Sequence, residues 1–187
     1  MELDMSKADY PSRMNSQFDK LTVGAAVIRF TSSNIPQVLL LQRKLDEAYY
    51  PGVYEIPGGK VDDMDATIAD AIIREVKEES NLTITQIVTA LPEITYTTEK
   101  KVTGKSGSEE SVIKHAIQLS YVVQVEDATQ FHWNPEENCN GIWASPSDLE
   151  GIAITDKMRS LVESAFESAR KSPMPEVVEK RIGKDRP

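Results

Sequence analysis

Apolar and polar positions along the first third of the chain predict three strands. Residues 22–30 and 38–42 are rich in apolar and β-branched residues, and a Ser-Ser-Asn-Ile-Pro turn separates them. These two runs are predicted to form a hairpin or two neighbouring strands. A short strand at 53–56 then leads directly into Pro57-Gly58-Gly59.

Helical spacing begins after these glycines. Ile68, Ile72 and Val76 recur at the spacing of one helix face, and the pattern predicts a helix that runs to about residue 80, with Asn81 as a left-handed cap. A closing amphipathic helix is predicted over 156–171, where five apolar residues share one face: Met158, Leu161, Val162, Ala165 and Phe166.

Between the two helices, the pattern returns to strands. Longer strands are predicted at 86–98 and 112–125, joined by an exposed hairpin loop at 99–111 that is rich in Lys, Gly and Ser. A short strand at 141–144 and one helical turn at 146–149 follow. Strands on both sides of a central helix predict a mixed sheet sandwiched by helices, an α/β fold.

No repeat or break in composition divides the 187 residues, so one domain is predicted over residues 21–172. Residues 1–20 have no periodicity and are expected to form a flexible arm or an extension at an edge. Residues 173–187 are rich in Pro and charge and are expected to be disordered.

The net charge of −9 argues against a general binder of nucleic-acid duplexes, which needs a basic face. A small molecule is therefore the expected partner. The single cysteine, Cys139, cannot form an internal disulfide, and we find neither a basic-apolar leader nor an apolar run of membrane length. We expect a soluble cytoplasmic protein, either a monomer or a homodimer, that does not associate with membranes.

The central helix carries a strip of three acids. Glu75, Glu78 and Glu79 lie at relative positions 0, 3 and 4, and Glu79 falls inside the apolar stripe of Ile72 and Val76. A carboxylate turned toward a core is costly unless it is paired or binds a cation, and Mg²⁺ prefers such oxygen ligands. The alternative is a solvated acidic face on which Arg74 pairs with Glu78.

This segment resembles the Nudix box. That pattern begins with Gly, five residues of any kind, Glu, seven residues of any kind and Arg-Glu. It continues with an apolar residue, any residue, Glu-Glu, any residue, Gly and a final apolar residue. The matching residues are Gly59, Arg74, Glu75, Val76, Glu78, Glu79 and Leu82. Asp65 replaces the first Glu, eight residues instead of seven precede Arg74, and Asn81 replaces the last Gly. The resemblance spans residues 20–170 and implies an α/β/α sandwich with a mixed β-sheet.

The resemblance implies hydrolysis of a phosphoanhydride bond in a nucleoside diphosphate linked to another moiety. It implies that Glu75, Glu78 and Glu79 hold Mg²⁺, with Mn²⁺ as an alternative ion, and that the Gly59 carbonyl is a further ligand. Arg74 is then the residue that orients the acids. Glu137, in a loop just before the last strand, is the candidate general base; the alternative is an exposed acidic loop.

Four residues around the start of the box are candidates for substrate binding. Gly58 and Gly59 let the backbone approach a ligand closely, and Lys60 follows them. Arg43 ends a strand just before the box, where it could reach substrate phosphates or simply be solvated.

Two other functions remain open. The altered spacing, Asp65 and Asn81 are compatible with a Nudix-fold binding or sensor protein that does no chemistry. Diphosphate isomerisation would require a catalytic cysteine, for which Cys139 is the single candidate. Substrate choice is expected to depend on loops outside the box, at 45–52, 99–111 and 126–140.

Overall fold

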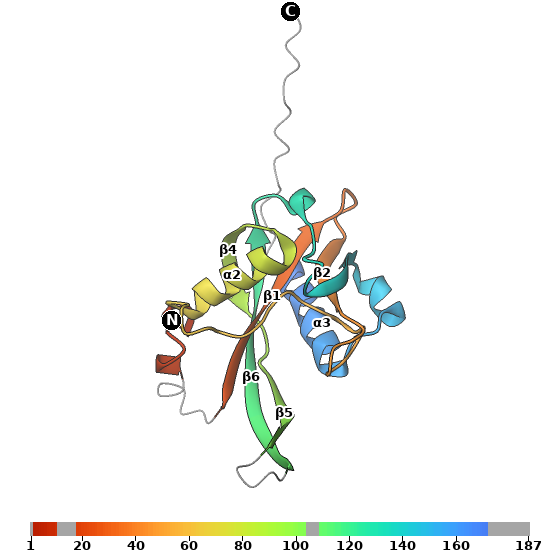
Figure 1. The fold of residues 1–187 in the computed structure, drawn as a ribbon. Coiled ribbons are helices and arrows are strands. Elements are labelled where there is room, and N and C mark those ends of the chain that lie inside the picture. Colours follow the sequence, from red (N-terminus) through yellow and green to blue (C-terminus); the bar gives the residue numbers. More distant parts are fainter. Residues whose placement is uncertain (1, 11–17, 104–108, 172–187) are drawn as a thin grey trace, which may run out of the picture.

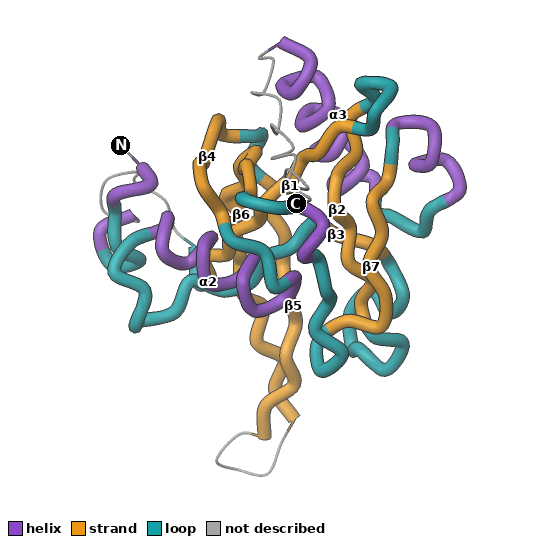
Figure 2. Tube along the Cα trace, turned by 90° about the horizontal axis from the view of Figure 1, so that it is seen from above, coloured by secondary structure: helices purple, strands orange, loops and turns teal. Residues whose placement is uncertain are grey.

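The computed structural model describes residues 2–10, 18–103 and 109–171. Within them a mixed sheet of seven strands lies between two helices (Figures 1 and 2). The strands are β1 Lys20–Phe30, β2 Pro36–Arg43, β3 Tyr54–Glu55, β4 Ile84–Ala90, β5 Ile94–Thr103, β6 Glu109–Val125 and β7 Asn138–Ala144. The helices are α2 Ile68–Ser80 and α3 Asp156–Lys171, and short 3-10 turns are η1 Glu2–Asp4, η2 Ala128–Gln130 and η3 Pro146–Gly151.

Strand β1 lies at the centre of the sheet. It runs parallel to β6, with Val23 beside Leu119, and antiparallel to β2. The strand order is β3-β2-β1-β6-β4, with β7 paired to β2 and β5 paired to β6. Both faces of β1 are covered, which explains why its sequence is a continuous apolar run instead of an alternating one.

Alternate side chains of β1 enter two different cores. Val23 and Ala25 pack with Ile68 and Ile72 of α2 on one face. On the other face Ala26 and Ile28 pack with the apolar stripe of α3, which includes Leu161, Val162 and Phe166. The predicted hairpin, the two helices and the sandwich architecture are thereby confirmed.

The prediction of one strand over 86–98 is wrong. Two strands, β4 and β5, occupy this region, and a bend at Leu91-Pro92-Glu93 separates them. Each pairs with a different part of β6: Ile87 lies beside Val123, and Ile94 beside Gln118. Proline has no N–H to donate to a ladder, so pairing with β6 is interrupted at Pro92 and resumes at Ile94 in the same direction.

The hairpin of β5 and β6 projects from the body of the sheet (Figure 1). Its strands extend further than the sequence predicts, because β5 continues to Thr103 and β6 begins at Glu109. The middle of the predicted 99–111 loop lies outside the described residues. None of the helices in the described part of the chain combines the length and apolar content that a membrane span requires.

Residues 2–10 lie against the body of the domain, unlike the flexible arm that their sequence suggests. Tyr10 is 2% exposed and belongs to the core on the α2 side, and Leu3 and Met5 pack against that core. The segment expected to be disordered, 173–187, lies outside the described residues, and the domain limits at 21 and 172 stay predictions.

The two ends of α2 are capped as their sequence indicates. The side chain of Thr67 accepts a hydrogen bond from the backbone N–H of Asp70 at the start of the helix. At the other end Asn81 has φ = 59°, and its N–H donates to the carbonyl of Lys77. Asn81 is therefore the left-handed cap predicted above, in place of the Gly of the Nudix box.

We expect Asn81→Ala to lower the free energy of unfolding by about 1–2 kcal/mol, because a Cβ is disfavoured at positive φ. Asn81→Gly should leave the stability within about 1 kcal/mol of the wild type. Urea unfolding of the three proteins measures both differences. Equal stability of the Ala and Gly variants would contradict the capping role of this backbone conformation.

Candidate active site

The glycine pair before α2 fits between β1 and the acidic face of the helix. A Cβ on Gly58 would lie 2.2 Å from the carbonyl oxygen of Val23, and one on Gly59 would lie 2.6 Å from the carboxylate of Glu75. The Gly59 carbonyl accepts a hydrogen bond from the N–H of Val23 at 2.8 Å. The absence of side chains therefore allows the loop, the strand and Glu75 to approach this closely.

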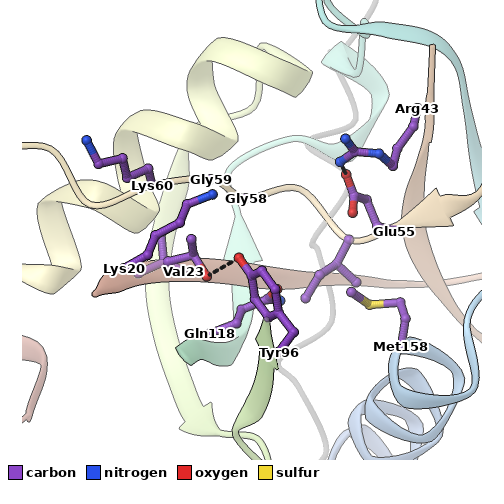
Figure 3. Close-up of a pocket in the computed structure, with 12 residues that line it drawn as sticks. Lys20, Val23, Arg43, Glu55, Gly58, Gly59, Lys60, Tyr96, Gln118 and Met158 are labelled. Carbon is purple, nitrogen blue, oxygen red and sulfur yellow. Dashed lines mark hydrogen bonds and ion pairs between the residues drawn. The ribbon is translucent and has the colours of Figure 1, made fainter. Parts of the chain in front are cut away.

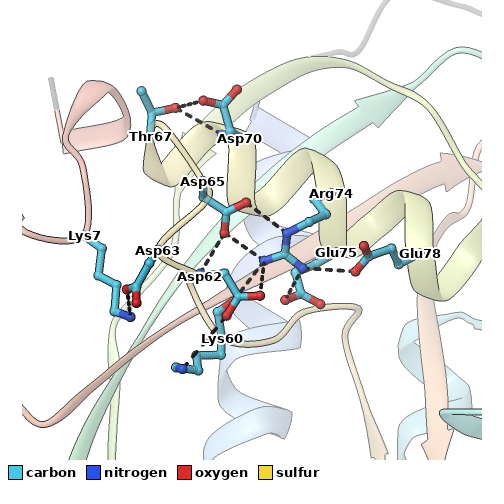
Figure 4. Close-up of polar contacts among 10 residues, drawn as sticks. All are labelled: Lys7, Lys60, Asp62, Asp63, Asp65, Thr67, Asp70, Arg74, Glu75 and Glu78. Atoms are coloured by element: carbon cyan, nitrogen blue, oxygen red, sulfur yellow. Dashed lines mark hydrogen bonds and ion pairs between the residues drawn. The ribbon is translucent and has the colours of Figure 1, made fainter.

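Arg74 is the centre of a network of carboxylates (Figure 4). Its Nε and Nη2 donate to the two oxygens of Asp65 at 2.9 and 2.8 Å, while Nη1 donates to Glu75 at 2.9 Å and to Glu78 at 3.0 Å. The bond to Asp65 raises the pKa of Arg74 and lowers that of Asp65. Asp65 therefore makes a bidentate ion pair with Arg74 even though eight residues separate the two.

Glu79 turns inward, to the glycine loop. Its Oε2 accepts the N–H of Gly58 at 2.7 Å, and its Oε1 accepts Nδ2 of Asn138 at 3.4 Å. Burial raises the pKa of Glu79 to about 8, and the negative charges of Glu55 and Glu75 add to this shift. The hydrogen bonds oppose the shift without offsetting it, so the half-buried Glu79 holds its proton more tightly than an ordinary carboxyl group.

Glu75 is buried as well, with 8% of its surface exposed. Burial raises the pKa of its carboxyl group, Arg74 opposes that shift, and the charges of Glu78 and Glu137 reinforce it. Glu137 lies in the turn before β7, where its carboxylate accepts a hydrogen bond from Nδ2 of Asn134. The structure thus brings the predicted loop acid into the electrostatic field of the helix acids.

A pocket of about 130 Å³ opens on the other side of the glycine pair (Figure 3). Its lining includes all four candidate substrate-binding residues: Arg43, Gly58, Gly59 and Lys60. The rest of the lining comes from β1, β3, β5, β6 and the start of α3: Lys20, Thr22, Val23, Glu55, Ile56, Tyr96, Gln118 and Met158. Its wall is therefore polar near the glycines and apolar near α3.

Arg43 already has partners inside the protein. Its guanidinium donates to Glu55 at 2.7 Å, to Glu47 at 3.1 Å and to the carbonyl of Tyr49. These contacts hold the 44–50 loop against β3. Lys20, which sequence reasoning missed, instead extends along the pocket toward Gly58 and Gly59 (Figure 3).

Two further residues near the acids were also missed. Asn138 is 4% exposed and contacts Glu79, and Glu55 adds negative charge beside the same group. Glu55 lies three positions before Gly58, so its proximity to the glycines in the sequence could have identified it as a candidate site residue. Nothing in the local sequence around Asn138 connects it with α2.

The chemistry of this donor set fits a hard divalent cation. Glu75, Glu78 and Glu79 supply carboxylate oxygens; burial, and to a smaller extent neighbouring negative charges, raise the pKa values of Glu75 and Glu79, and a bound cation would favour their charged forms. In the arrangement described here Glu75 and Glu78 are paired with Arg74. Within the described residues, no three His, Cys, Asp or Glu side chains converge on one point.

Fold and site together define a Nudix-type α/β/α sandwich with an acidic helix beside a glycine loop. Residues 20–164 match the model of the NUDIX domain, and the chain belongs to this family. It is thus a member of a class of hydrolases that act on phosphoric anhydrides and generally use divalent metal ions. No curated protein matches the sequence.

Solved structures of Nudix proteins share this fold. The NUDIX domain of Shewanella oneidensis NrtR in complex with ADP ribose is 18% identical, with a TM-score of 0.60 over 88% of this chain and 99% of that one. A C. elegans Ap4A hydrolase in a binary complex is 21% identical, with a TM-score of 0.57 over 82% and 99% of the two chains. A MutT Nudix hydrolase from Burkholderia pseudomallei is 21% identical, with a TM-score of 0.53 over 78% and 96%.

The raised pKa of Glu79 predicts a pH-dependent difference in stability. Folding raises the pKa of Glu79 from 4.5 to about 8. The resulting stabilisation of the folded wild type is therefore greatest below pH 4.5, the pKa in the unfolded chain, and is lost as the pH rises through about 8, the pKa in the folded protein. Glu79→Gln does not titrate. In the presence of a chelator, its free energy of unfolding relative to the wild type should increase by roughly 2–4 kcal/mol between about pH 5 and pH 9.

Urea unfolding at several pH values measures this difference. Glu163→Gln, which removes an exposed carboxylate from α3, is the matched control and should show a difference that is independent of pH. A Glu79→Gln curve parallel to that of the wild type would contradict the proposed desolvation of Glu79.

Proposed function

We propose that this protein is a magnesium-dependent hydrolase that cleaves a phosphoanhydride bond in a nucleoside diphosphate linked to another moiety. The observation that supports this most strongly is the Arg74 network beside Glu79, because it orders acids on one helix face next to a half-buried carboxyl group with a raised pKa. The S. oneidensis domain was solved with ADP ribose, and the C. elegans enzyme is an Ap4A hydrolase. Both ligands contain phosphoanhydride bonds.

We assign the metal site to Glu75, Glu78 and Glu79, with the Gly59 carbonyl as a further ligand. This carbonyl has already accepted one hydrogen bond, from Val23, and keeps a second lone pair. Mg²⁺, or Mn²⁺ as an alternative, would neutralise the diphosphate and lower the pKa of the attacking water. Arg74 is itself held by Asp65 and in turn orients Glu75 and Glu78 through its hydrogen bonds.

Glu137 is our candidate for the general base. It lies near enough to Glu75 to raise the pKa of that group, and its carboxylate accepts a hydrogen bond from Asn134, a neighbour in the same turn. Because Glu137 is not one of the assigned metal ligands, its carboxylate can take a proton from water while Glu75, Glu78 and Glu79 hold the metal ion.

We place part of the substrate in the pocket on the other side of the glycine pair. Lys20 directs its ammonium group toward Gly58 and Gly59, so it can bind a phosphate of the substrate. Gln118 and Tyr96 offer polar groups deeper in the pocket, and Met158 offers an apolar wall. Arg43 contributes through Glu55, which it holds at the pocket wall.

Glu78→Gln and Glu79→Gln should each reduce magnesium-dependent turnover by about 100-fold or more, because each removes a charged metal ligand. Chromatography of the nucleotide products from a panel of nucleoside triphosphates, nucleotide sugars, dinucleotides and dinucleoside polyphosphates measures this turnover and also identifies the substrate. Glu163→Gln should behave as the wild type. Unchanged turnover in either Gln variant at the box would refute the mechanism.

Lys20→Ala should raise KM by about tenfold with a smaller change in kcat, because a charge-assisted bond to a phosphate contributes roughly 1.5–3 kcal/mol. Lys20→Arg should recover most of that affinity. Steady-state kinetics on the best substrate of the panel separates the two parameters. A Lys20→Ala variant with wild-type KM would remove Lys20 from the substrate site.

A nucleotide-binding or sensor protein without turnover is the second candidate. It is favoured by the pairing of Glu75 and Glu78 with Arg74, which keeps both acids from converging with Glu79. The same panel decides between the two functions when nucleotide binding is measured by calorimetry and hydrolysis by chromatography of the products. Binding of a nucleotide without formation of any hydrolysis product would favour the sensor.

A further inference from the structure

The N-terminal segment, residues 2–10, is far from the acidic helix in sequence but lies beside the start of that helix in the fold (Figure 1). The carbonyl of Met5 accepts a hydrogen bond from the backbone N–H of Ile68 at 2.9 Å. Ile68 is the first residue of α2, so its N–H has no partner within the helix. Thr67 caps Asp70 in the same turn, and a distant segment therefore completes the capping of α2.

Three anchors hold the N-terminal segment in this position. Tyr10 is buried in the core on the α2 side, where burial and the neighbouring Glu93 and Glu2 raise its pKa to about 12. The hydroxyl of Tyr121, on β6, donates to the carboxylate of Glu2 at 2.9 Å. Leu3 and Met5 supply apolar contacts to the same core. The segment is thus bound to the sheet at one side and to α2 at the other.

The connection over residues 60–67 lies next to this segment. Nζ of Lys7 binds the carboxylate of Asp63 at 2.6 Å (Figure 4). Two positions further on, Asp65 forms the bidentate pair with Arg74. The Lys7 pair is weak by itself because Asp63 is 89% exposed, so the backbone bond of Met5 and the apolar anchors are the stronger constraints.

We infer that the N-terminal segment positions the acidic site. By holding residues 60–67 and the first turn of α2, it keeps Asp65 in register with Arg74, and Arg74 in turn orients Glu75 and Glu78. The extra residue between Asp65 and Arg74 lengthens this stretch relative to the family pattern, which makes an external constraint useful. The inference depends on the proposed function only for its measurement of Mg²⁺ affinity.

The test is a double variant, Leu3→Ser with Met5→Ser, in the full chain. It removes the apolar anchors of the segment without removing any side chain of the acidic site. We expect amide hydrogen exchange over residues 60–70 to become at least about tenfold faster, and the affinity for Mg²⁺, measured by calorimetry, to fall about tenfold. Met64→Ser, at a side chain that is 94% exposed in the same connection, is the control and should change neither quantity.

A second variant tests the inference where the double variant fails to fold. Tyr121→Phe removes only the hydroxyl that donates to Glu2, and we expect changes in the same direction that are several-fold smaller. The conservative pair Leu3→Ile with Met5→Leu should restore wild-type exchange and affinity.

Two outcomes would overturn the inference. If amide exchange over residues 60–70 is unchanged in the double variant, the N-terminal segment does not hold this connection. If exchange accelerates but the affinity for Mg²⁺ stays at the wild-type value, the segment stabilises the fold without positioning the acidic site. A wild type that turns over nothing would instead contradict the proposed hydrolase, and exchange and Mg²⁺ affinity would still decide about the segment.

Discussion

The charge of one guanidinium group holds the acidic site together. Arg74 contacts carboxylates from the connection before α2 and from α2 itself, and without it these like charges would repel one another at short range. Its fork binds Asp65 through two parallel bonds, which fixes an angle as well as a distance. The glycine pair brings the loop close enough for these contacts, and the domain around it provides the rigid frame.

The parts of the fold that depend on local pattern could be predicted from the sequence. The hairpin of β1 and β2, the two helices and the Asn81 cap follow from periodicity and turn chemistry, which act over a few residues. The division at Leu91-Pro92-Glu93 was missed because it depends on β6, which is long enough to pair with two strands in succession. The packing of residues 2–10 was missed for a similar reason, since Tyr10 and Met5 meet their partners only in the folded chain.

The candidate site divides in the same way. The strip of Glu75, Glu78 and Glu79 could be predicted because it lies on one helix, whose geometry converts sequence spacing into spatial proximity. Asn138 and Lys20 could not, since each comes from a strand far away in the sequence. Arg43 was identified by position, but its ion pair with Glu55 depends on the register between β2 and β3.

Gly58 and Gly59 separate two regions that differ in what they tolerate. On the helix side Asp65, Glu75 and Glu78 share Arg74, and the charge of Glu75 acts on Glu79, so a change at one residue alters the electrostatics of the others. On the pocket side the wall is assembled from the glycine loop and six separate elements, β1, β2, β3, β5, β6 and α3. Selection can therefore remodel that wall one side chain at a time, giving the same reaction centre a new substrate while the buried charges remain as they are.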